Sequence, residues 1–275
     1  MNALYTWGVA RAAGGRVVLR IEDHDRQRSR PEYEADLLTD LERLGLVPDE
    51  PTIEDFRRGP TPWRQSDSGT AYESALGRLR AQGLVYACAC ARSSFAAWAA
   101  EHGRPWRGPG CPGGCRRRRR PESSGTSLRV ALDVGSEAWE DLLAGPMKGD
   151  PAASGDLLVR DRNRNWTYAL CVVVDDLRHG IDLVIRGHDL LDATPAQLRL
   201  ARLLGRKTQP RFLHHPLLRT ASGRKLSKAE ADTSVRSMLD AGSTPADLFG
   251  RAARLAGLCE AETPTDAKDL ASLFA

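Results

Sequence analysis

Apolar residues recur at helical spacing in two segments of the first 83 residues. Pro31 suits the first turn of a helix, and the apolar stripe after it consists of Leu37, Leu38, Leu41 and Leu44. Residues 68–82 carry a second amphipathic pattern, which Gly83 ends. Residues 3–13 are also interpreted as a helix, which ends at Gly14-Gly15. Three helices are therefore predicted, two of them with one buried face.

Short apolar runs predict buried strands between further helices. They lie at residues 16–21, 156–159, 171–174 and 183–185. The first run leads directly into Glu22. A helix capped by Thr194, with Pro195 in its first turn, is predicted to run to Leu204. This alternation of strands and helices predicts an α/β fold with a mostly parallel sheet.

The composition changes between residues 84 and 147, where cysteines and Gly/Pro-rich turns gather. We interpret this segment as a small inserted domain. Residues 1–83 and 148–230 are then the two halves of the α/β domain. Residues 231–275 are Ala-rich, and their pattern predicts a helical C-terminal segment.

Four cysteines of the insertion form two closely spaced pairs, Cys88 with Cys90 and Cys111 with Cys115. Two such pairs on turns can supply the tetrahedral thiolate shell of a structural zinc ion. The glycines between the second pair allow the chain to curl tightly around a metal. The alternative is a loop with free or oxidised thiols. Cys171 and Cys259 lie in apolar stretches, which favours core thiols.

A run of five arginines, residues 116–120, follows the second cysteine pair. Such a run can meet RNA phosphates, or it can form a solvated loop. Its position beside the metal site favours RNA. The net charge of +4 permits an RNA partner without demanding one.

The chain contains no apolar run of about 18 residues, so no membrane span is predicted. Its N-terminus lacks the basic and apolar regions of a signal peptide. We therefore expect a monomeric, cytoplasmic protein.

A short polar loop, residues 222–228, carries Lys225 and Lys228. Two ammonium groups that close over a triphosphate would neutralise charge on the reacting phosphate and on the pyrophosphate leaving group. Charged surface loops are common, so this loop alone is weak evidence for ATP binding.

Together, the motifs resemble the class I glutamyl-tRNA synthetases, and above all their short paralogues, the glutamyl-queuosine tRNA(Asp) synthetases. The matching blocks are residues 18–23, 64–66, 84–90, 111–116, 172–176, 185–191, 213–216 and 225–228. The resemblance implies a Rossmann-type catalytic domain, an inserted acceptor-binding domain that carries the zinc, and ATP as a substrate together with Mg²⁺.

The resemblance also implies roles for single residues. Glu22 would face the ammonium of L-glutamate, Tyr168 would shape its pocket, and Arg186 would meet a substrate carboxylate as a bidentate partner. Lys225 and Lys228 would act on ATP, with Lys228 nearest to it. Other roles are open for the first three residues: a helix cap for Glu22, a core position for Tyr168, and an ion pair with Asp189 for Arg186.

The sequence departs from the family pattern near its start. The phosphate-binding signature His-Ile-Gly-His and the segment Pro-Ser-Pro-Thr-Gly, which precedes it in the family, would both lie before residue 2. We therefore expect an N-terminally truncated form, from a start placed too far downstream or from a real loss, that activates glutamate poorly or not at all. The short segment after Lys228 leaves no room for anticodon-binding domains, which favours the short paralogues.

Three functions remain open from the sequence. The first is a ligase that activates L-glutamate with ATP and transfers it to the queuosine base of tRNA(Asp). The second is a zinc-stabilised RNA-binding protein without catalysis. The third is a truncated glutamyl-tRNA synthetase that charges the 3′ end of a tRNA.

Overall fold

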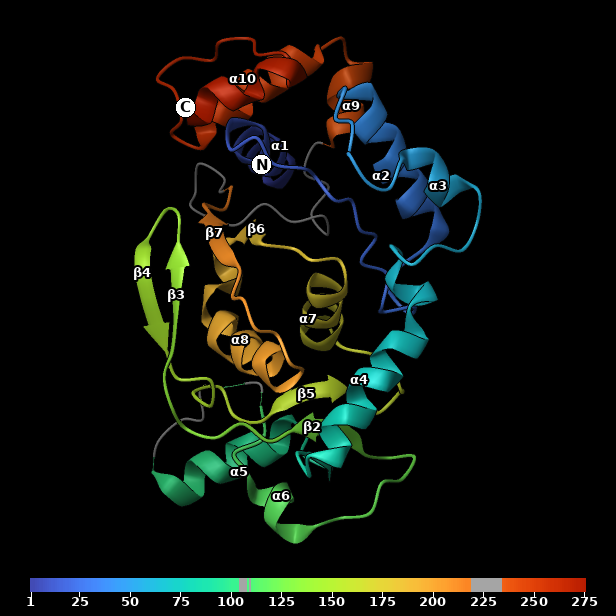
Figure 1. Cartoon of the computed structure of the whole chain (residues 1–275), viewed down its shortest axis with the longest axis vertical. Coiled ribbons are helices and arrows are strands. Elements are labelled where there is room, and N and C mark those ends of the chain that lie inside the picture. Colours follow the sequence, from blue (N-terminus) through green and yellow to red (C-terminus); the bar gives the residue numbers. More distant parts are fainter. Residues whose placement is uncertain (104–107, 109, 219–233) are drawn as a thin grey trace.

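The structure is a computed structural model, which describes residues 1–103, 108, 110–218 and 234–275. Helix α1 (Asn2–Ala12) and helix α10 (Pro245–Leu255) lie at one end of the molecule, close to both termini (Figure 1). Helix α5 (Arg92–His102) and helix α6 (Gly114–Arg118) lie at the opposite end. Two β-sheets occupy the region between these ends.

The three predicted N-terminal helices are confirmed. They are α1, α2 (Pro31–Arg43) and α4 (Gly69–Ala81). Leu38 and Leu41 of α2 are buried, but the prediction was wrong for Leu37, which is 45% exposed. A short helix, α3 (Ile53–Arg57), and the 3-10 helix η1 (Gln65–Asp67) connect α2 to α4.

Residues 16–21 do not form the predicted strand. Val18 and Ile21 make single β-bridges with two different loops, at Glu50 and Arg64. The backbone N–H of Leu19 donates to the carbonyl of Glu50, whereas that of Ile21 donates to Trp63. Because its hydrogen bonds are divided between two loops, the segment is extended without joining a ladder.

The larger sheet has the order β4-β3-β7-β6. Its strands are β3 (Glu137–Asp141), β4 (Gly145–Gly149), β6 (Leu183–Gly187) and β7 (Arg211–His215). Strands β3, β7 and β6 run parallel, while β4 forms an antiparallel hairpin with β3. The parallel sheet predicted from the sequence is thus confirmed for three strands, and the strand predicted at 183–185 is β6.

Helices cover both faces of this sheet. Leu213 of β7 packs with Tyr5 and Val9 of α1, whereas Phe212 packs on the other face with Leu198 of α8 (Thr194–Leu203). Alternate residues of one strand point to opposite faces, so a single strand serves both helices. The 3-10 helix η2 (His188–Ala193) connects β6 to α8.

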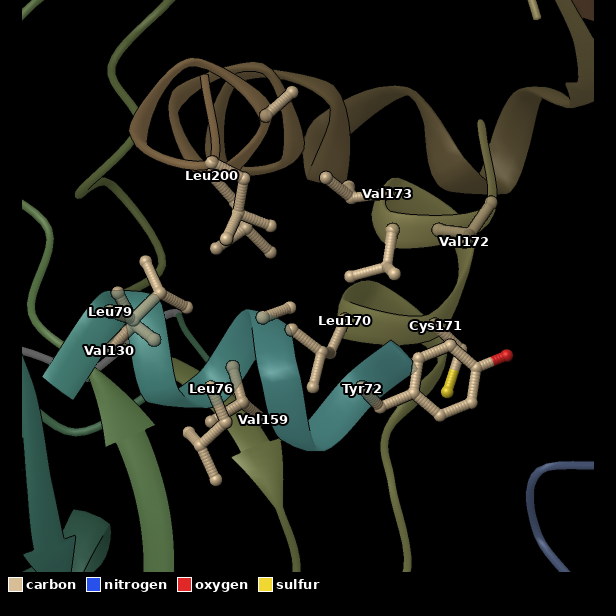
Figure 2. Packing of buried hydrophobic residues seen from close by; sticks show 14 of the residues in the cluster. Tyr72, Leu76, Leu79, Val130, Val159, Leu170, Cys171, Val172, Val173 and Leu200 are labelled. Atoms are coloured by element: carbon tan, nitrogen blue, oxygen red, sulfur yellow. The ribbon is translucent and has the colours of Figure 1, made fainter. Parts of the chain in front are cut away.

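Residues 171–174 were predicted as a strand, and this is wrong. They lie in helix α7 (Tyr168–Arg178), where all four are buried. Figure 2 shows α7 packed between α4 and α8, with Tyr72 and Leu200 among its neighbours. A helix that is buried on nearly every side shows no polar periodicity, so its apolar run looks like a buried strand.

Thr194 also differs from its predicted role. It is the first residue of α8, but its hydroxyl accepts a hydrogen bond from Arg186 Nη2 at 2.8 Å and does not cap the helix. Pro195 in the first turn and Gly205 after the end of the helix, with φ of +88°, agree with the prediction.

The smaller sheet is antiparallel and has the order β1-β2-β5. Its strands are β1 (Val85–Cys88), β2 (Ser127–Val130) and β5 (Leu157–Arg160). Strand β5 confirms the strand predicted at 156–159, displaced by one residue. The hairpin β3-β4 lies in sequence between β2 and β5, yet it pairs with the larger sheet through β7.

The C-terminal segment is helical, as predicted. It contains α9 (Val235–Asp240), α10 and the 3-10 helix η4 (Ala267–Phe274), which packs against α1. In the part of the chain that the structure describes, no helix is long and apolar enough to cross a membrane.

Buried side-chain hydrogen bonds join α7 to η1 and α4. The carboxylate of Asp175, which is fully buried, accepts hydrogen bonds from Tyr72 of α4, Gln65 of η1 and Arg178 of α7. Burial raises the pKa of Asp175, and the nearby cations Arg20 and Arg178 oppose this effect. One side chain therefore ties α7 to η1 and α4, which lie about 100 residues earlier in the chain.

Replacing Asp175 by Ala should lower the free energy of unfolding by about 3–5 kcal/mol, because it leaves buried donors and a cation without their acceptor. Urea unfolding followed by circular dichroism measures this loss. The exposed Asp192 provides a control, whose replacement by Ala should change stability by less than about 0.5 kcal/mol. Similar small effects for both variants would contradict the role given to Asp175.

Candidate active site and metal centre

Arg20 holds Glu22 at the end of the extended segment 16–21. Its guanidinium donates to Glu22 Oε1 from Nη2 at 2.8 Å and to Asp176 Oδ1 from Nη1 at 2.7 Å. Burial opposes the charge of Arg20, but the two carboxylates raise its pKa above the ordinary value. Glu22 is only partly buried, with 38% of its side chain exposed, so it can still meet a ligand.

Tyr168 is the first residue of α7, and the charges of both Glu22 and Arg186 are near enough to act on it. Burial raises the pKa of Tyr168, the charge of Glu22 raises it further, and Arg186 lowers it through its charge and a hydrogen bond. The ring of His24 lies 6.3 Å from the Tyr168 ring, between centroids. The structure thus brings an acid, a phenol and a guanidinium from three separate segments into one region.

Arg186 is buried, with 4% of its surface exposed, near the end of β6. Its Nε donates to His214 Nε2 at 3.0 Å, and its Nη1 donates to Gln197 Oε1 at 2.5 Å. Nη2 donates to the hydroxyl of Thr194 and, at 3.4 Å, to the carbonyl of Leu190. The guanidinium is therefore held firmly by the protein.

The cavity that touches Arg186 has a volume of about 20 Å³, with Asp176 and Arg206 also in its wall. This is space for about one water molecule. Pockets for small molecules have several hundred Å³. This cavity does not by itself hold an amino acid.

The predicted ATP residues Lys225 and Lys228 lie outside the described residues, and so does the loop that carries them. Their position relative to Glu22 and Arg186 remains a prediction.

The four cysteines of the insertion converge. The sulfur atoms of Cys88, Cys90, Cys111 and Cys115 all lie within 4.8 Å of one another. Cys90 Sγ is 3.7 Å from Cys111 Sγ and 3.4 Å from Cys115 Sγ. Ligands about 2.3 Å from a tetrahedral metal are about 3.8 Å apart, so the cluster has the size of a four-thiolate metal site.

The cluster favours a thiolate at Cys111, whereas a hydrogen bond with Cys111 raises the pKa of Cys88 and burial raises the pKa of Cys90. A hydrogen bond with Cys88, together with backbone N–H groups of Cys115 and Gly113, lowers the pKa of Cys111 to about 4 although burial acts in the opposite direction. Tyr86 bonds to Asp156 at 2.7 Å and also neighbours Cys111. These contacts hold the sulfur atoms in place for a metal ion.

A large cavity adjoins the cysteine cluster. Its volume is about 1130 Å³, and Cys111, Tyr86 and Asp156 form part of its wall. Four members of the exposed arginine run also line it: Arg116, Arg117, Arg119 and Arg120. Arg116 pairs with Asp133 at 3.3 Å. The cavity is therefore a basic hollow beside the candidate metal centre.

Sequence reasoning did not assign roles to several polar residues around Glu22 and Arg186. Arg20 and Asp176 lie within the motifs quoted for the family resemblance, so a signal for them existed. His214 lies in another of these motifs. Asp141 has no such signal, because only the pairing of β3 with β7 brings it to the site.

Comparison with known proteins identifies the family. The profile of tRNA synthetases class I (E and Q), catalytic domain, matches residues 1–263. The chain belongs to this family. It is 42% identical to a glutamyl-Q tRNA(Asp) synthetase of Symbiobacterium thermophilum, over 99% of this chain and 86% of that relative. A protein of the same name from Rhodobacter capsulatus is 36% identical, over 90% of this chain and 91% of the relative.

A solved structure supports the fold. A glutamate tRNA ligase from Elizabethkingia meningosepticum, in complex with its amino acid, superposes with a TM-score of 0.75 at 22% identity. The match covers 98% of this chain, which spans 60% of the length of that ligase. The predicted α/β class I synthetase fold is confirmed, and the chain is an aminoacyl-tRNA synthetase-like ligase by family.

We expect the cysteine cluster to bind one metal ion per chain, because four thiolates fit a tetrahedral shell. Metal analysis of the purified protein checks this expectation. Replacing Cys115 by Ser should lower the metal content and the melting temperature, whereas the same change at Cys259, outside the cluster, should affect neither. Equal metal content in both variants would contradict a metal site at the cluster.

Proposed function

We propose that the protein activates L-glutamate with ATP and transfers it to the queuosine base of tRNA(Asp). The observation that carries this proposal is the grouping of Glu22, Tyr168 and Arg186 in a chain whose close relatives are named glutamyl-Q tRNA(Asp) synthetases. These three residues offer opposite charges for the two ends of an amino acid.

Each side chain has a physical role in this proposal. Glu22 binds the substrate ammonium, and Arg20 orients its carboxylate from the protein side. Arg186 attracts a substrate carboxylate mainly through its positive charge, because four of its five N–H groups already donate to protein acceptors. Tyr168 lies between them, and its hydroxyl contributes to the wall of the pocket. Lys225 and Lys228 bind the phosphates of ATP, which Mg²⁺ accompanies, and stabilise the charge that develops on them.

Activation itself needs no protein nucleophile. A carboxylate oxygen of glutamate attacks the α-phosphorus of ATP, the bond to pyrophosphate breaks, and glutamyl-adenylate forms. Holding the two reactants in line and neutralising the leaving group supplies most of the acceleration. The acyl group then passes to a hydroxyl of the queuosine base, and AMP leaves.

Replacing Glu22 by Gln should weaken the binding of L-glutamate about ten- to hundredfold, because the amide oxygen still accepts from the substrate ammonium but no longer carries a negative charge. Calorimetry measures binding directly and does not depend on the rate of turnover. Glu50→Gln is a matched control, since Glu50 pairs with Arg16 at the surface. Unchanged binding in Glu22→Gln, with binding present in the wild type, would contradict the role of Glu22.

The second step has its own assay, which follows radioactive glutamate into RNA. tRNA(Asp) that carries queuosine should accept it, and the same tRNA without queuosine should not. A relative from Syntrophus aciditrophicus, named glutamate--tRNA ligase 2, is 36% identical over 92% of this chain. It supports a second candidate, the charging of a tRNA 3′ end. Labelling of tRNA(Glu) in place of tRNA(Asp) would favour that function.

We further propose that the metal in the cysteine cluster is zinc and that its role is structural. Cys88, Cys90, Cys111 and Cys115 supply four ligands, which leaves no coordination position for a substrate. The ion would hold β1 and α6 together and thus support the basic hollow beside them.

The arginine run is proposed to bind RNA phosphates, because Arg117, Arg119 and Arg120 are exposed and line one wall of the hollow. The affinity for tRNA should fall with rising salt concentration, and the slope of log affinity against log salt measures this fall. Replacing these three arginines by Gln should make the slope shallower by about two units. Filter binding at several salt concentrations measures this slope. Three exposed arginines on other elements, Arg58, Arg211 and Arg254, form the control set. Equal slopes for both sets would contradict the proposal.

A further inference from the structure

Three neighbouring parallel strands place an acid, an imidazole and a guanidinium in a row. Arg186 of β6 and His214 of β7 are direct partners in the ladder. On the other side of β7, Asp141 of β3 is the partner of Phe212. Because Phe212 and His214 are two residues apart, they point to the same face of the sheet. The register therefore places Asp141, His214 and Arg186 on one face.

The three side chains are connected by short hydrogen bonds. Asp141 Oδ2 lies 2.5 Å from His214 Nδ1, and His214 Nε2 lies 3.0 Å from Arg186 Nε. The side chains of Asp141 and His214 have no exposed surface. Asp141 Oδ1 accepts two backbone N–H groups, from Leu143 and Ala144, at 3.0 and 3.1 Å. The carboxylate is thus anchored at one end of the row.

The protons in this row can be assigned from chemistry alone. Arginine has only N–H donors, so the nitrogen of His214 that faces it must accept. His214 Nε2 is therefore unprotonated, and Nδ1 carries the proton and donates it to Asp141. The carboxylate fixes the imidazole in the one neutral tautomer that can accept from Arg186.

The two terminal nitrogens of the Arg186 guanidinium also form hydrogen bonds within the protein. Gln197 and Thr194 of α8 accept from its two terminal nitrogens, and the guanidinium carbon lies 5.3 Å from the centre of the Phe212 ring. These contacts orient the guanidinium plane. Because four of the five N–H groups donate to the protein, the orientation of the guanidinium decides where its one remaining N–H and its charge can meet a carboxylate.

We propose that Asp141 and His214 are positioning residues for Arg186, which set the affinity of the protein for its carboxylate substrate without touching that substrate. The inference rests on the proposed function, since it concerns the same glutamate site. His214 acts as the acceptor that fixes the rotation of the guanidinium, and Asp141 acts by fixing the tautomer of His214.

The test compares L-glutamate binding, measured by calorimetry, among variants of the full chain. His214→Leu removes the acceptor for Arg186 Nε and should raise the dissociation constant about tenfold or more. His214→Gln restores an acceptor oxygen at a similar distance from the backbone and should recover most of the affinity. Asp141→Asn allows the other tautomer of His214 and should weaken binding to an intermediate degree.

The next residue of the same strand provides a matched control. His215 is also buried, but it points to the opposite face, where its ring stacks on Tyr5 at 5.2 Å. His215→Leu should therefore leave glutamate binding unchanged even if it lowers the melting temperature as much as His214→Leu does. ATP binding, measured in parallel, should stay the same in all four variants.

The outcomes distinguish a failure of the positioning role from a failure of the proposed function. If the wild type and His214→Leu bind glutamate equally well, the positioning role is overturned and the glutamate site itself stands. Equal losses in His214→Leu, His214→Gln and His215→Leu would overturn it as well, because they would show a general effect on the sheet. Absence of glutamate binding in the wild type would overturn the proposed function and, with it, this inference.

Discussion

The fully buried carboxylate of Asp175 is the interaction on which the arrangement of the molecule depends. A charge in the interior is costly unless it is surrounded by donors and opposite charge, and here Tyr72, Gln65 and Arg178 provide them. Tyr72 belongs to α4 and Gln65 to η1, so these two bonds can form only when both elements are docked correctly on α7, whereas Arg178 donates from α7 itself. The same feature that stabilises the fold therefore also specifies how helix α7 packs.

The candidate glutamate site is built directly on this framework. The neighbouring Asp176 binds Arg20, and Arg20 in turn binds Glu22. Tyr168 begins the same helix. Two of the three proposed substrate contacts thus depend on α7, whereas the third, Arg186, depends on the register of the parallel sheet. The site lies where the helix and the sheet meet, and small shifts between them would separate its charges.

The candidate metal centre is organised by different means. Its cysteines come from β1, from α6 and from the turns beside them, and hydrogen bonds within the cluster keep the sulfur atoms together. The hairpin β3-β4 follows β2 in sequence but pairs with β7 of the larger sheet. The chain between the metal centre and α7 therefore contributes strands to both sheets.

The sequence by itself determined the helices with one apolar face, the strands at β5 and β6, and the grouping of four cysteines, because local spacing carries each of these features. The same spacing misassigned residues 171–174, since a helix that is buried on nearly every side shows no polar periodicity over that stretch. Only the tertiary structure decided that Asp141 reaches His214 and that Arg20 joins Glu22 to Asp176. Those contacts link residues far apart in the chain, and no local pattern records which strands become neighbours.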